Sequence, residues 1–456
     1  MEQNILDKKT VKIHFTGVLG VSMSSIAKHL SACGYTVSGT DNDVNGDYKS
    51  LTDFGVNARF KHSAKMVKGT DAVVFTSAVN EKNPELKYAK RKNIPIFKRS
   101  EILGKIISQH KISIAVSGSH GKTTATAMIA DMLIRAGKDP TVFLGGESVT
   151  FGNYRKGGGT FALTEACEYK KNFLDIKPKI SVVLNIDNDH QDSYSDMADM
   201  ERAFNQFIRS SITVLNADDK RVSKLESVAA ITFGTLNNAV ITAKKIKKTE
   251  QGYQFVACAY GRPLGEVKLK VIGKHNIYNA LATIAVAEIL KIPFNLVKKS
   301  LESFLGVKRR AEYLGQINNA NCFADYAHHP KEIGATITAY KEQVGSFAVV
   351  FQPHTYSRTK YLMQEFCDVL KNNEDLVVYK TYAAREKFDE DGSERALYER
   401  LKKCSSAKMH LCSSEEELES TVKKLTETYK AILFLGAGDV YDKAKEIVAK
   451  NKSKNI

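Results

Sequence analysis

The chain is 456 residues long, which is more than one hydrophobic core supports and predicts about three domains. Hydrophobic residues make up 43% and charged residues 26%, as in ordinary soluble globular proteins. The net charge of +16 is spread along the whole chain without a basic arm or an aromatic-rich RNA motif, so it favours anionic substrates over nucleic acid. No apolar run approaches the ~20 residues that cross a bilayer, and the amino terminus lacks the apolar core of a signal peptide. Seven scattered cysteines without a CxxC pair indicate reduced thiols and no structural zinc, so we expect a cytoplasmic protein.

The first predicted strand, near residues 11–16, runs into Gly17-Val-Leu-Gly20-Val-Ser22 and a helix. A second strand ends at Asp41, and further strands are expected at 72–76 and 94–97. The spacing is similar to a dinucleotide fingerprint, but Ser22 stands where the third glycine or alanine belongs. We therefore predict a phosphate-bearing ligand here. A nicotinamide dehydrogenase is disfavoured because nothing in the chain supplies a hydride-transfer site.

The most informative stretch is a predicted strand at 112–116 that delivers Gly118-Ser-His-Gly-Lys-Thr-Thr124 to a helix over 123–134. A helix that starts after a glycine turn offers free N–H groups to phosphate. Lys122 would reach the outer phosphates, and the Thr123 hydroxyl would bind a magnesium ion. The alternative interpretation of this stretch is a plain glycine turn without a ligand. Val116 occupies the place of the first P-loop glycine, which indicates a narrower family than nucleoside triphosphatases at large.

Further strands are expected at 160–164, 180–184 and 213–216, then an antiparallel portion over 231–271 and a helix over 276–290. Glu165 and His190 each follow a strand, on the rim where Lys122 lies, so together they predict a metal site beside the γ-phosphate. Each alone would more often be a surface residue or a helix cap. His275 and Asn276 open the helix, either as a cap or as contacts to a base or ribose.

A third α/β region begins near residue 309, with strands expected at 323–325, 346–351, 376–379 and 431–435. Asp325-Tyr-Ala-His-His-Pro330 and Gln352-Pro-His-Thr-Tyr-Ser-Arg358 both follow strands. Their histidines, tyrosine and arginine predict a pocket for a small anionic substrate, because arginine suits carboxylates. A lone histidine would more often be structural, but here the residues cluster.

These motifs together resemble the Mur ligases over nearly the whole chain. Four motifs follow one another in the order found in the family. They are Gly118-Ser-His-Gly-Lys-Thr-Thr124, Glu165-Ala-Cys-Glu-Tyr169, Asn185-Ile-Asp-Asn-Asp-His190 and His275-Asn276. The motifs at 325–330, 351–358, 382–387 and 436–439 are similar to those of its L-alanine-adding branch.

The resemblance implies an α/β protein of three domains: a Rossmann-like UDP-sugar-binding domain (1–108), a P-loop-type ATPase domain with a mixed sheet (109–308) and a Rossmann-like amino-acid-binding domain (309–456). It implies an ATP- and Mg²⁺-dependent ligase of peptidoglycan precursor synthesis. L-alanine would be joined to the lactyl carboxylate of UDP-N-acetylmuramate through an acyl phosphate, with release of ADP and phosphate. A monomer or weak homodimer is expected, without nucleic acid or membrane insertion.

The resemblance also implies roles for single residues. The UDP-sugar would be held by Gly17, Gly20 and Ser22 at the diphosphate and by Asp41, His62 and Ser77 at the uridine end. ATP would be bound by Gly118, Ser119, His120, Gly121, Lys122, Thr123, Thr124, His275, Asn276 and Asp325. The metal would be held by Thr123, Glu165 and His190. The alanine and muramyl side would be lined by Tyr326, His328, His354 and Arg358, and the expected catalytic residues are Lys122, His328, His354 and Arg358.

The chain departs from the family pattern at three points. Leu19 and Ser22 replace glycines of the first loop, and Thr355 stands where an arginine is common. Between residues 190 and 216 we find no clear counterpart of the carbamylated lysine of sister ligases, which fits the alanine branch. Two alternatives stay open: a recycling ligase that joins a preformed tripeptide to the same UDP-sugar, and a non-catalytic nucleotide-gated binding protein.

Overall fold

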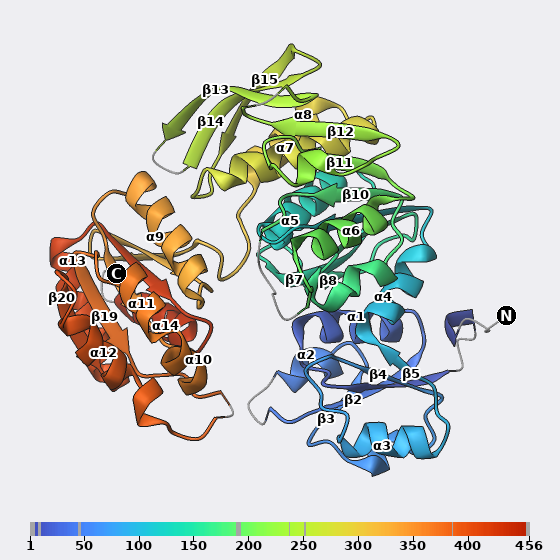
Figure 1. The fold of residues 1–456 in the computed structure, drawn as a ribbon, viewed down its shortest axis with the longest axis horizontal. Coiled ribbons are helices and arrows are strands. Elements are labelled where there is room, and N and C mark those ends of the chain that lie inside the picture. Colours follow the sequence, from blue (N-terminus) through green and yellow to red (C-terminus); the bar gives the residue numbers. More distant parts are fainter. Residues whose placement is uncertain are drawn as a thin grey trace. The chain divides into compact units, whose positions relative to one another are not determined.

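The computed structural model describes residues 5–7, 11–43, 47–187, 193–236, 238–249, 252–384 and 386–452. They form two compact units (Figure 1). The first unit comprises Met1–Ile246, Gln254–Leu269 and His275–Leu305, and the second comprises Lys247–Tyr253, Lys270–Lys274 and Gly306–Ile456. The described residues contain three sheets, and each sheet falls inside one of the three predicted domains. The domain boundaries at 108/109 and 308/309 themselves stay predictions.

The N-terminal sheet has five parallel strands in the order β3-β2-β1-β4-β5. They are β1 (Lys12–Thr16), β2 (Thr36–Asp41), β3 (Asn57–Phe60), β4 (Ala72–Phe75) and β5 (Ile96–Lys98). The helices are α1 (Val21–Ala32), α2 (Tyr48–Thr52), α3 (Pro84–Arg91) and α4 (Arg99–Ser108), with short 3₁₀ turns η1 (Ile5–Asp7) and η2 (Ala64–Val67). Ile13 and Phe15 are fully buried, as expected for a central parallel strand covered on both faces. The sequence did not predict β3, because this edge strand is largely exposed and carries no apolar run.

The second sheet has ten strands in the order β15-β14-β13-β12-β11-β10-β6-β9-β7-β8. They are β6 (Ile112–Ser117), β7 (Thr141–Ser148), β8 (Gly152–Arg155), β9 (Phe161–Glu165), β10 (Ile180–Val183), β11 (Ile212–Asn216), β12 (Ala230–Gly234), β13 (Ile241–Thr249), β14 (Gly252–Ala259) and β15 (Arg262–Leu269). The strands from β7 through β9, β6, β10 and β11 to β12 pair in parallel, whereas β7 and β8 are antiparallel, so the sheet is mixed as expected. The antiparallel portion does not begin at residue 231, because β12 pairs in parallel with both β11 and β13. Alternation of apolar and polar residues does not encode strand direction, which depends on the path of the connection.

The helices of this part are α5 (Lys122–Arg135), α6 (Met197–Ile208), α7 (His275–Ile289) and α8 (Phe294–Ser303), with 3₁₀ segments η3 (Tyr169–Asp175) and η4 (Val222–Lys224). Helix α5 packs against α7 and α8 (Figure 1). The buried face of α5 consists of small and medium side chains such as Ala125, Ala127 and Met128, which allow this close packing. The helix that follows the cradle is thereby anchored at a fixed position.

The third sheet has six strands in the order β16-β17-β21-β18-β19-β20. They are β16 (Glu312–Ile317), β17 (Ala320–Asp325), β18 (Ala348–Phe351), β19 (Asp375–Tyr379), β20 (Lys408–Cys412) and β21 (Ala431–Leu435). All pair in parallel except β16, which is antiparallel to β17. The helices are α9 (Pro330–Gln343), α10 (Tyr356–Tyr361), α11 (Met363–Leu370), α12 (Glu394–Lys402), α13 (Glu415–Thr428) and α14 (Val440–Lys452), with η5 (Glu390–Gly392). The four central strands match the prediction, and the two edge strands β16 and β20 were not predicted.

All seven cysteines lie among the described residues and are free thiols. Among the same residues, none of the helices has both the length and the apolar character to cross a membrane.

Candidate functional site: a phosphate cradle and two substrate regions

The phosphate cradle lies between β6 and α5. Gly118 and Gly121 have φ angles of 139° and 84°, a region that residues with a Cβ rarely adopt. A Cβ at Gly118 would also lie 3.1 Å from backbone atoms of Asn185. Helix α5 begins directly after Gly121, so its free N–H groups face the loop. The turn therefore has the backbone geometry that a phosphate cradle requires.

Lys122 is held at this loop by a buried carboxylate. Its Nζ lies 3.0 Å from Oε2 and 3.1 Å from Oε1 of Glu168, whose side chain is completely buried. The same ammonium donates to the carbonyl oxygens of Gly118 and Ser119. The tyrosine hydroxyl of Tyr194 in turn donates to the Glu168 carbonyl. The positive charge thus lies over its own loop, where the outer phosphates of a nucleotide would need it.

Two of the predicted metal ligands meet beside Lys122. The Thr123 hydroxyl donates to Oε2 of Glu165 over 3.0 Å, and the N–H of Gly145 on β7 donates to Oε1 over 2.5 Å. A hydroxyl and a carboxylate at a phosphate cradle are the oxygen ligands that magnesium prefers. His190, the third predicted ligand, lies outside the described residues. Within the described part of the chain there is no ready-made group of three or more acidic, histidine or cysteine ligands.

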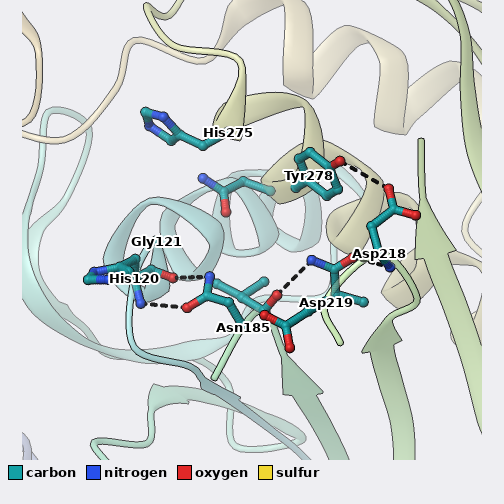
Figure 2. A pocket seen from close by; sticks show the side chains of 10 residues that line it. His120, Gly121, Asn185, Asp218, Asp219, His275 and Tyr278 are labelled. Carbon is teal, nitrogen blue, oxygen red and sulfur yellow. Dashed lines mark hydrogen bonds between the residues drawn. The ribbon is translucent and has the colours of Figure 1, made fainter. Parts of the chain in front are cut away.

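A pocket of ≈ 270 Å³ opens next to the cradle, at the carboxyl ends of β10 and β11 (Figure 2). Asn185 ties it to the loop: its Oδ1 accepts from the His120 N–H over 2.8 Å, and its Nδ2 donates to the His120 carbonyl over 3.0 Å. On the other side the Tyr278 hydroxyl donates to Asp218 over 3.0 Å. The pocket is lined by His120, Gly121, Leu184, Asn185, Asn216, Asp218, Asp219, His275, Tyr278 and Asn279.

Sequence reasoning placed His120, Gly121 and His275 in this region but missed Asn216, Asp218, Asp219, Tyr278 and Asn279. The signal was available, because Asn216 ends β11, and Asn279 lies one helical turn after His275. Asn276 was expected to contact the nucleotide. Its side chain is buried, and its Oδ1 accepts from Nδ2 of Asn279, a lining residue, over 3.0 Å; its contact with the nucleotide stays a prediction.

The first glycine loop is built around the end of β2. The N–H groups of Gly17 and Val18 donate to the Thr40 carbonyl over 2.8 and 3.0 Å, and Gly17 has a φ of 87°. Gly20 is the N-cap of α1, and Asp41 accepts from the Leu19 N–H over 3.1 Å. The Asp41 carboxylate therefore shapes the loop itself. The amino end of α1 is left as a place for phosphate.

A buried carboxylate that the sequence analysis missed lies beneath this loop. Glu85, fully buried on α3, accepts hydrogen bonds from the hydroxyls of Thr16 and Thr40 and from the Ser63 N–H. His62 contacts the same cluster, with Nδ1 2.8 Å from the Thr40 hydroxyl. Burial would raise the pKa of Glu85, but hydrogen bonds from His14 and His62 outweigh it and hold that pKa far below its usual range.

Not all residues predicted at the uridine end reach this cluster. His62 belongs to it, whereas Ser77 is exposed, two residues beyond the end of β4. The acid at position 85 looked like an ordinary first-turn helix residue, so the sequence carried no sign of its role.

The second unit brings its four predicted pocket residues together. The ring centroids of Tyr326 and His328 lie 5.2 Å apart and those of His328 and His354 5.6 Å apart, while Arg358 Nη1 donates to His354 Nδ1 over 3.0 Å. The His354 ring also stacks on Tyr382 at 5.5 Å. Burial, reinforced by the Arg358 and His328 charges, lowers the pKa of His354 to about 4. This imidazole is therefore neutral at physiological pH.

Backbone strain accompanies this cluster. Thr355, between His354 and α10, has a φ of 67°, which is unusual for a β-branched residue. Its N–H donates to the Tyr382 carbonyl over 2.9 Å, which holds the strained turn in place. Such strain tends to persist where surrounding contacts over-determine a functional site.

The Asp325 carboxylate, at the end of β17, accepts hydrogen bonds from the nearby backbone. It accepts from the N–H groups of Ala311 and Ala327 over 2.8 and 2.9 Å. Burial raises its pKa, against the opposing charge of Arg310. Its predicted contact with the nucleotide stays a prediction.

Comparison with known proteins covers all three parts of the chain. Residues 12–111 match the model of the Mur ligase family catalytic domain, 116–287 that of the Mur ligase middle domain, and 309–438 that of the Mur ligase glutamate ligase domain. The chain is also 40% identical over 94% of its length to a UDP-N-acetylmuramate–L-alanine ligase of Clostridium acetobutylicum, of which it covers 96%.

The chain belongs to the Mur ligase family. Among solved structures, this Mur ligase is similar to the UDP-N-acetylmuramate-alanine ligase of Thermotoga maritima, with a TM-score of 0.82, 30% identity and coverage of 97% of this chain and 99% of that one. It is also similar to a murein peptide ligase of Psychrobacter arcticus, with a TM-score of 0.69, 21% identity and coverage of 96% and 98%. The second likeness shows a shared fold alone.

Proposed function

We propose that this Mur ligase joins L-alanine to the lactyl carboxylate of UDP-N-acetylmuramate at the expense of ATP. The observation that carries the proposal is the near-full-length similarity to proteins named for this reaction, two of them at 40% identity. The nucleotide-gated binding protein is disfavoured, because the cradle has its lysine and an acidic ligand in contact with Thr123. Because ATP and UDP-sugars are made in the cytoplasm, we propose that the reaction takes place there.

The first half of the reaction is phosphoryl transfer. A carboxylate oxygen of the UDP-sugar forms a bond to the γ-phosphorus as the bond to the β,γ-bridging oxygen breaks, giving an acyl phosphate and ADP. Once the Lys122 ammonium leaves its ion pair with Glu168, it stabilises the negative charge on the transferred phosphoryl group. Thr123 and Glu165 would hold a magnesium ion, which supplies further neutralisation of phosphate charge when it is bound. The pocket beside His275 and Tyr278 accepts the base or ribose.

The second half is attack by the alanine amine on the acyl carbon, with loss of phosphate and of one proton. The hydrogen-bond pattern favours His328 over His354 as the proton acceptor. A carbonyl oxygen only accepts, so the His328 Nδ1, 3.0 Å from the Tyr326 carbonyl, carries a proton and leaves Nε2 with a lone pair. In His354 the lone pair of Nδ1 is already engaged by Arg358, which always donates.

Neutral His328 is available at pH 7. Burial lowers its pKa, although the Glu332 carboxylate opposes this effect. Arg358 then remains as the partner for the alanine carboxylate, with Tyr326 and His354 as walls of the pocket.

Phosphate release from MgATP tests the proposal directly. The purified chain is assayed with UDP-N-acetylmuramate and, in turn, L-alanine, glycine, L-serine or the tripeptide. Release that requires both the UDP-sugar and L-alanine supports the proposal and defines its specificity. Release that requires the tripeptide would establish the recycling ligase instead, and no release with any pairing despite ATP binding would establish a non-catalytic protein.

A further inference from the structure

Arg99, the first residue of α4, is a partly buried cation that none of the roles above uses. Its Nη1 donates to the Ser22 hydroxyl over 2.8 Å, at the amino end of α1. Burial lowers its pKa, and the nearby acidic groups that oppose this are Cys167, Glu165 and Asp175. Among the described residues its hydrogen-bond partner is a neutral hydroxyl, so a guanidinium with five donors has most of them unused.

The position of Arg99 is fixed by tight packing of α4. A Cβ at Gly104 would lie 2.0 Å from the Asp175 carbonyl oxygen, and the hydroxyl of buried Ser100 donates to Asn172 over 3.3 Å. Asp175 and Asn172 belong to η3, which follows the segment carrying Glu165 and Glu168. Arg99 is therefore hydrogen-bonded to the glycine loop through Ser22, and the charge of Glu165, beside the cradle, also acts on its guanidinium.

We infer that Arg99 binds the carboxylate of the UDP-sugar and holds it for transfer of the γ-phosphoryl group. This inference rests on the proposed function, because that reaction is what brings a carboxylate from the glycine loop to the cradle. A partly buried guanidinium with most of its donors unused is suited to an anionic partner, and its planar fork matches a carboxylate. Its one hydrogen-bonded neighbour, Ser22, belongs to the UDP-sugar loop, which favours the substrate carboxylate over the γ-phosphate of ATP.

The test compares two sugar nucleotides that differ by the lactyl group, which carries the carboxylate. Binding of UDP-N-acetylmuramate and of UDP-N-acetylglucosamine, which lacks that group, is measured by calorimetry for the full chain and for Arg99→Ala. We expect the variant to bind UDP-N-acetylmuramate about 10- to 100-fold more weakly, the usual effect of losing a charged hydrogen bond. Affinity for UDP-N-acetylglucosamine should change less than about threefold, and the KM for ATP should stay the same.

Two further variants keep the test decisive. Arg99→Lys retains the charge and most of the packing, so its loss should be smaller but again confined to UDP-N-acetylmuramate. Arg91→Ala removes an exposed arginine of α3 that lies over Tyr88, and it should leave both affinities unchanged. Equal weakening of both ligands would assign Arg99 to the diphosphate, a raised KM for ATP would assign it to the γ-phosphate, and unchanged affinities would leave it a packing residue.

Each of these last three results overturns the inference. Failure of the proposed function would look different: the unmodified chain would release no phosphate with UDP-N-acetylmuramate and alanine. If the unmodified chain releases phosphate while Arg99→Ala keeps its affinity for UDP-N-acetylmuramate, only the role of Arg99 is wrong.

Discussion

The Lys122 ammonium has to meet two opposite requirements, one without nucleotide and one with it. In the absence of nucleotide its ammonium needs a counter-charge, which the fully buried Glu168 supplies at 3.0 Å. In the proposed reaction it would have to stabilise charge on the transferred phosphoryl group. A buried carboxylate next to the cradle meets the first requirement without filling the cradle. If Lys122 acts as proposed, binding of ATP replaces one anionic partner of its ammonium by another.

Substitution of Lys122 by alanine should therefore abolish most turnover while UDP-sugar binding remains. Loss of one charged donor to a developing oxyanion reduces kcat by about 10²- to 10³-fold. The measurement is phosphate release together with the affinity for UDP-N-acetylmuramate, and Lys82→Ala, which removes a lysine outside every site described above, serves as the control. Activity within tenfold of the unmodified chain would show that Lys122 does not act on the phosphates.

At the scale of elements, β7 positions Glu165, the proposed metal ligand at the end of β9. Gly145 of β7 donates its N–H to Glu165 over 2.5 Å, and a Cβ at this glycine would lie 2.8 Å from the same carboxylate. Gly145→Ala should push Glu165 away from Thr123 and raise the Mg²⁺ concentration for half-maximal phosphate release by about tenfold, since one misplaced ligand costs about this much.

The matched control is Gly334→Ala in α9, where the new Cβ would meet Val369 at 3.4 Å, an ordinary contact. Both changes add one methyl group, but only the first should alter the Mg²⁺ requirement. The affinity for UDP-N-acetylmuramate should be unaffected in both. An unchanged Mg²⁺ requirement in Gly145→Ala would remove Glu165 from the metal site.

The packing of α1 against the β7–β8 hairpin makes a prediction about pH. His29 on α1 is buried, with Nδ1 3.1 Å from the Tyr154 hydroxyl and its ring edge-on to Phe143 at 5.1 Å. Burial lowers its pKa to about 4, helped by His110 and Lys156. Because the unfolded chain takes up this proton near pH 6.5 and the folded chain does not, the stabilisation is fully present above pH 6.5 and is lost as the pH falls towards 4.

We expect His29 to account for about 2–3 kcal/mol of the free energy of unfolding that is lost between pH 7.5 and pH 4.5. The measurement is denaturant unfolding of the unmodified chain and of His29→Gln at both pH values. Other acid-sensitive groups are common to the two proteins, so the difference isolates His29. Equal losses in both proteins would show that His29 is not neutral in the folded state.

The parts of the site that the sequence predicted are contiguous in the chain or follow strands. The cradle is a single segment, and Glu165 could be placed beside Thr123 because the carboxyl ends of parallel strands share one edge of a sheet. Glu85, Glu168 and Arg99 had no such signal. Their partners lie 45, 46 and 77 residues away, and these contacts depend on side-chain packing between elements rather than on strand order.

The same distinction explains the fold. Apolar runs such as β1, β6 and β21 were predicted, whereas the edge strands β3 and β20, which are largely or partly exposed, were not. The inner strand β7 was also missed. The parallel pairing of β12 with β13 also could not be predicted, because the alternation of apolar and polar residues does not specify the direction of a strand.

At the scale of the whole molecule, the net charge of +16 acts on every anionic substrate at once. Lysines spread over the surface create a positive potential that speeds the approach of ATP and the UDP-sugar, and dissolved salt screens it. The screening length falls from about 30 Å at 0.01 M to about 10 Å at 0.1 M salt. The kcat/KM for UDP-N-acetylmuramate should therefore fall several-fold over this range.

Alanine provides the internal control, because a zwitterion without net charge gains little from a long-range potential. Its kcat/KM, measured at saturating ATP and UDP-sugar, should be nearly flat over the same range of salt. If both substrates respond equally, salt acts on the enzyme's folding or turnover rather than on encounter. A response confined to the anionic substrates would mean that the basic surface serves catalysis by steering, which is a property of the whole charge distribution and of no single residue.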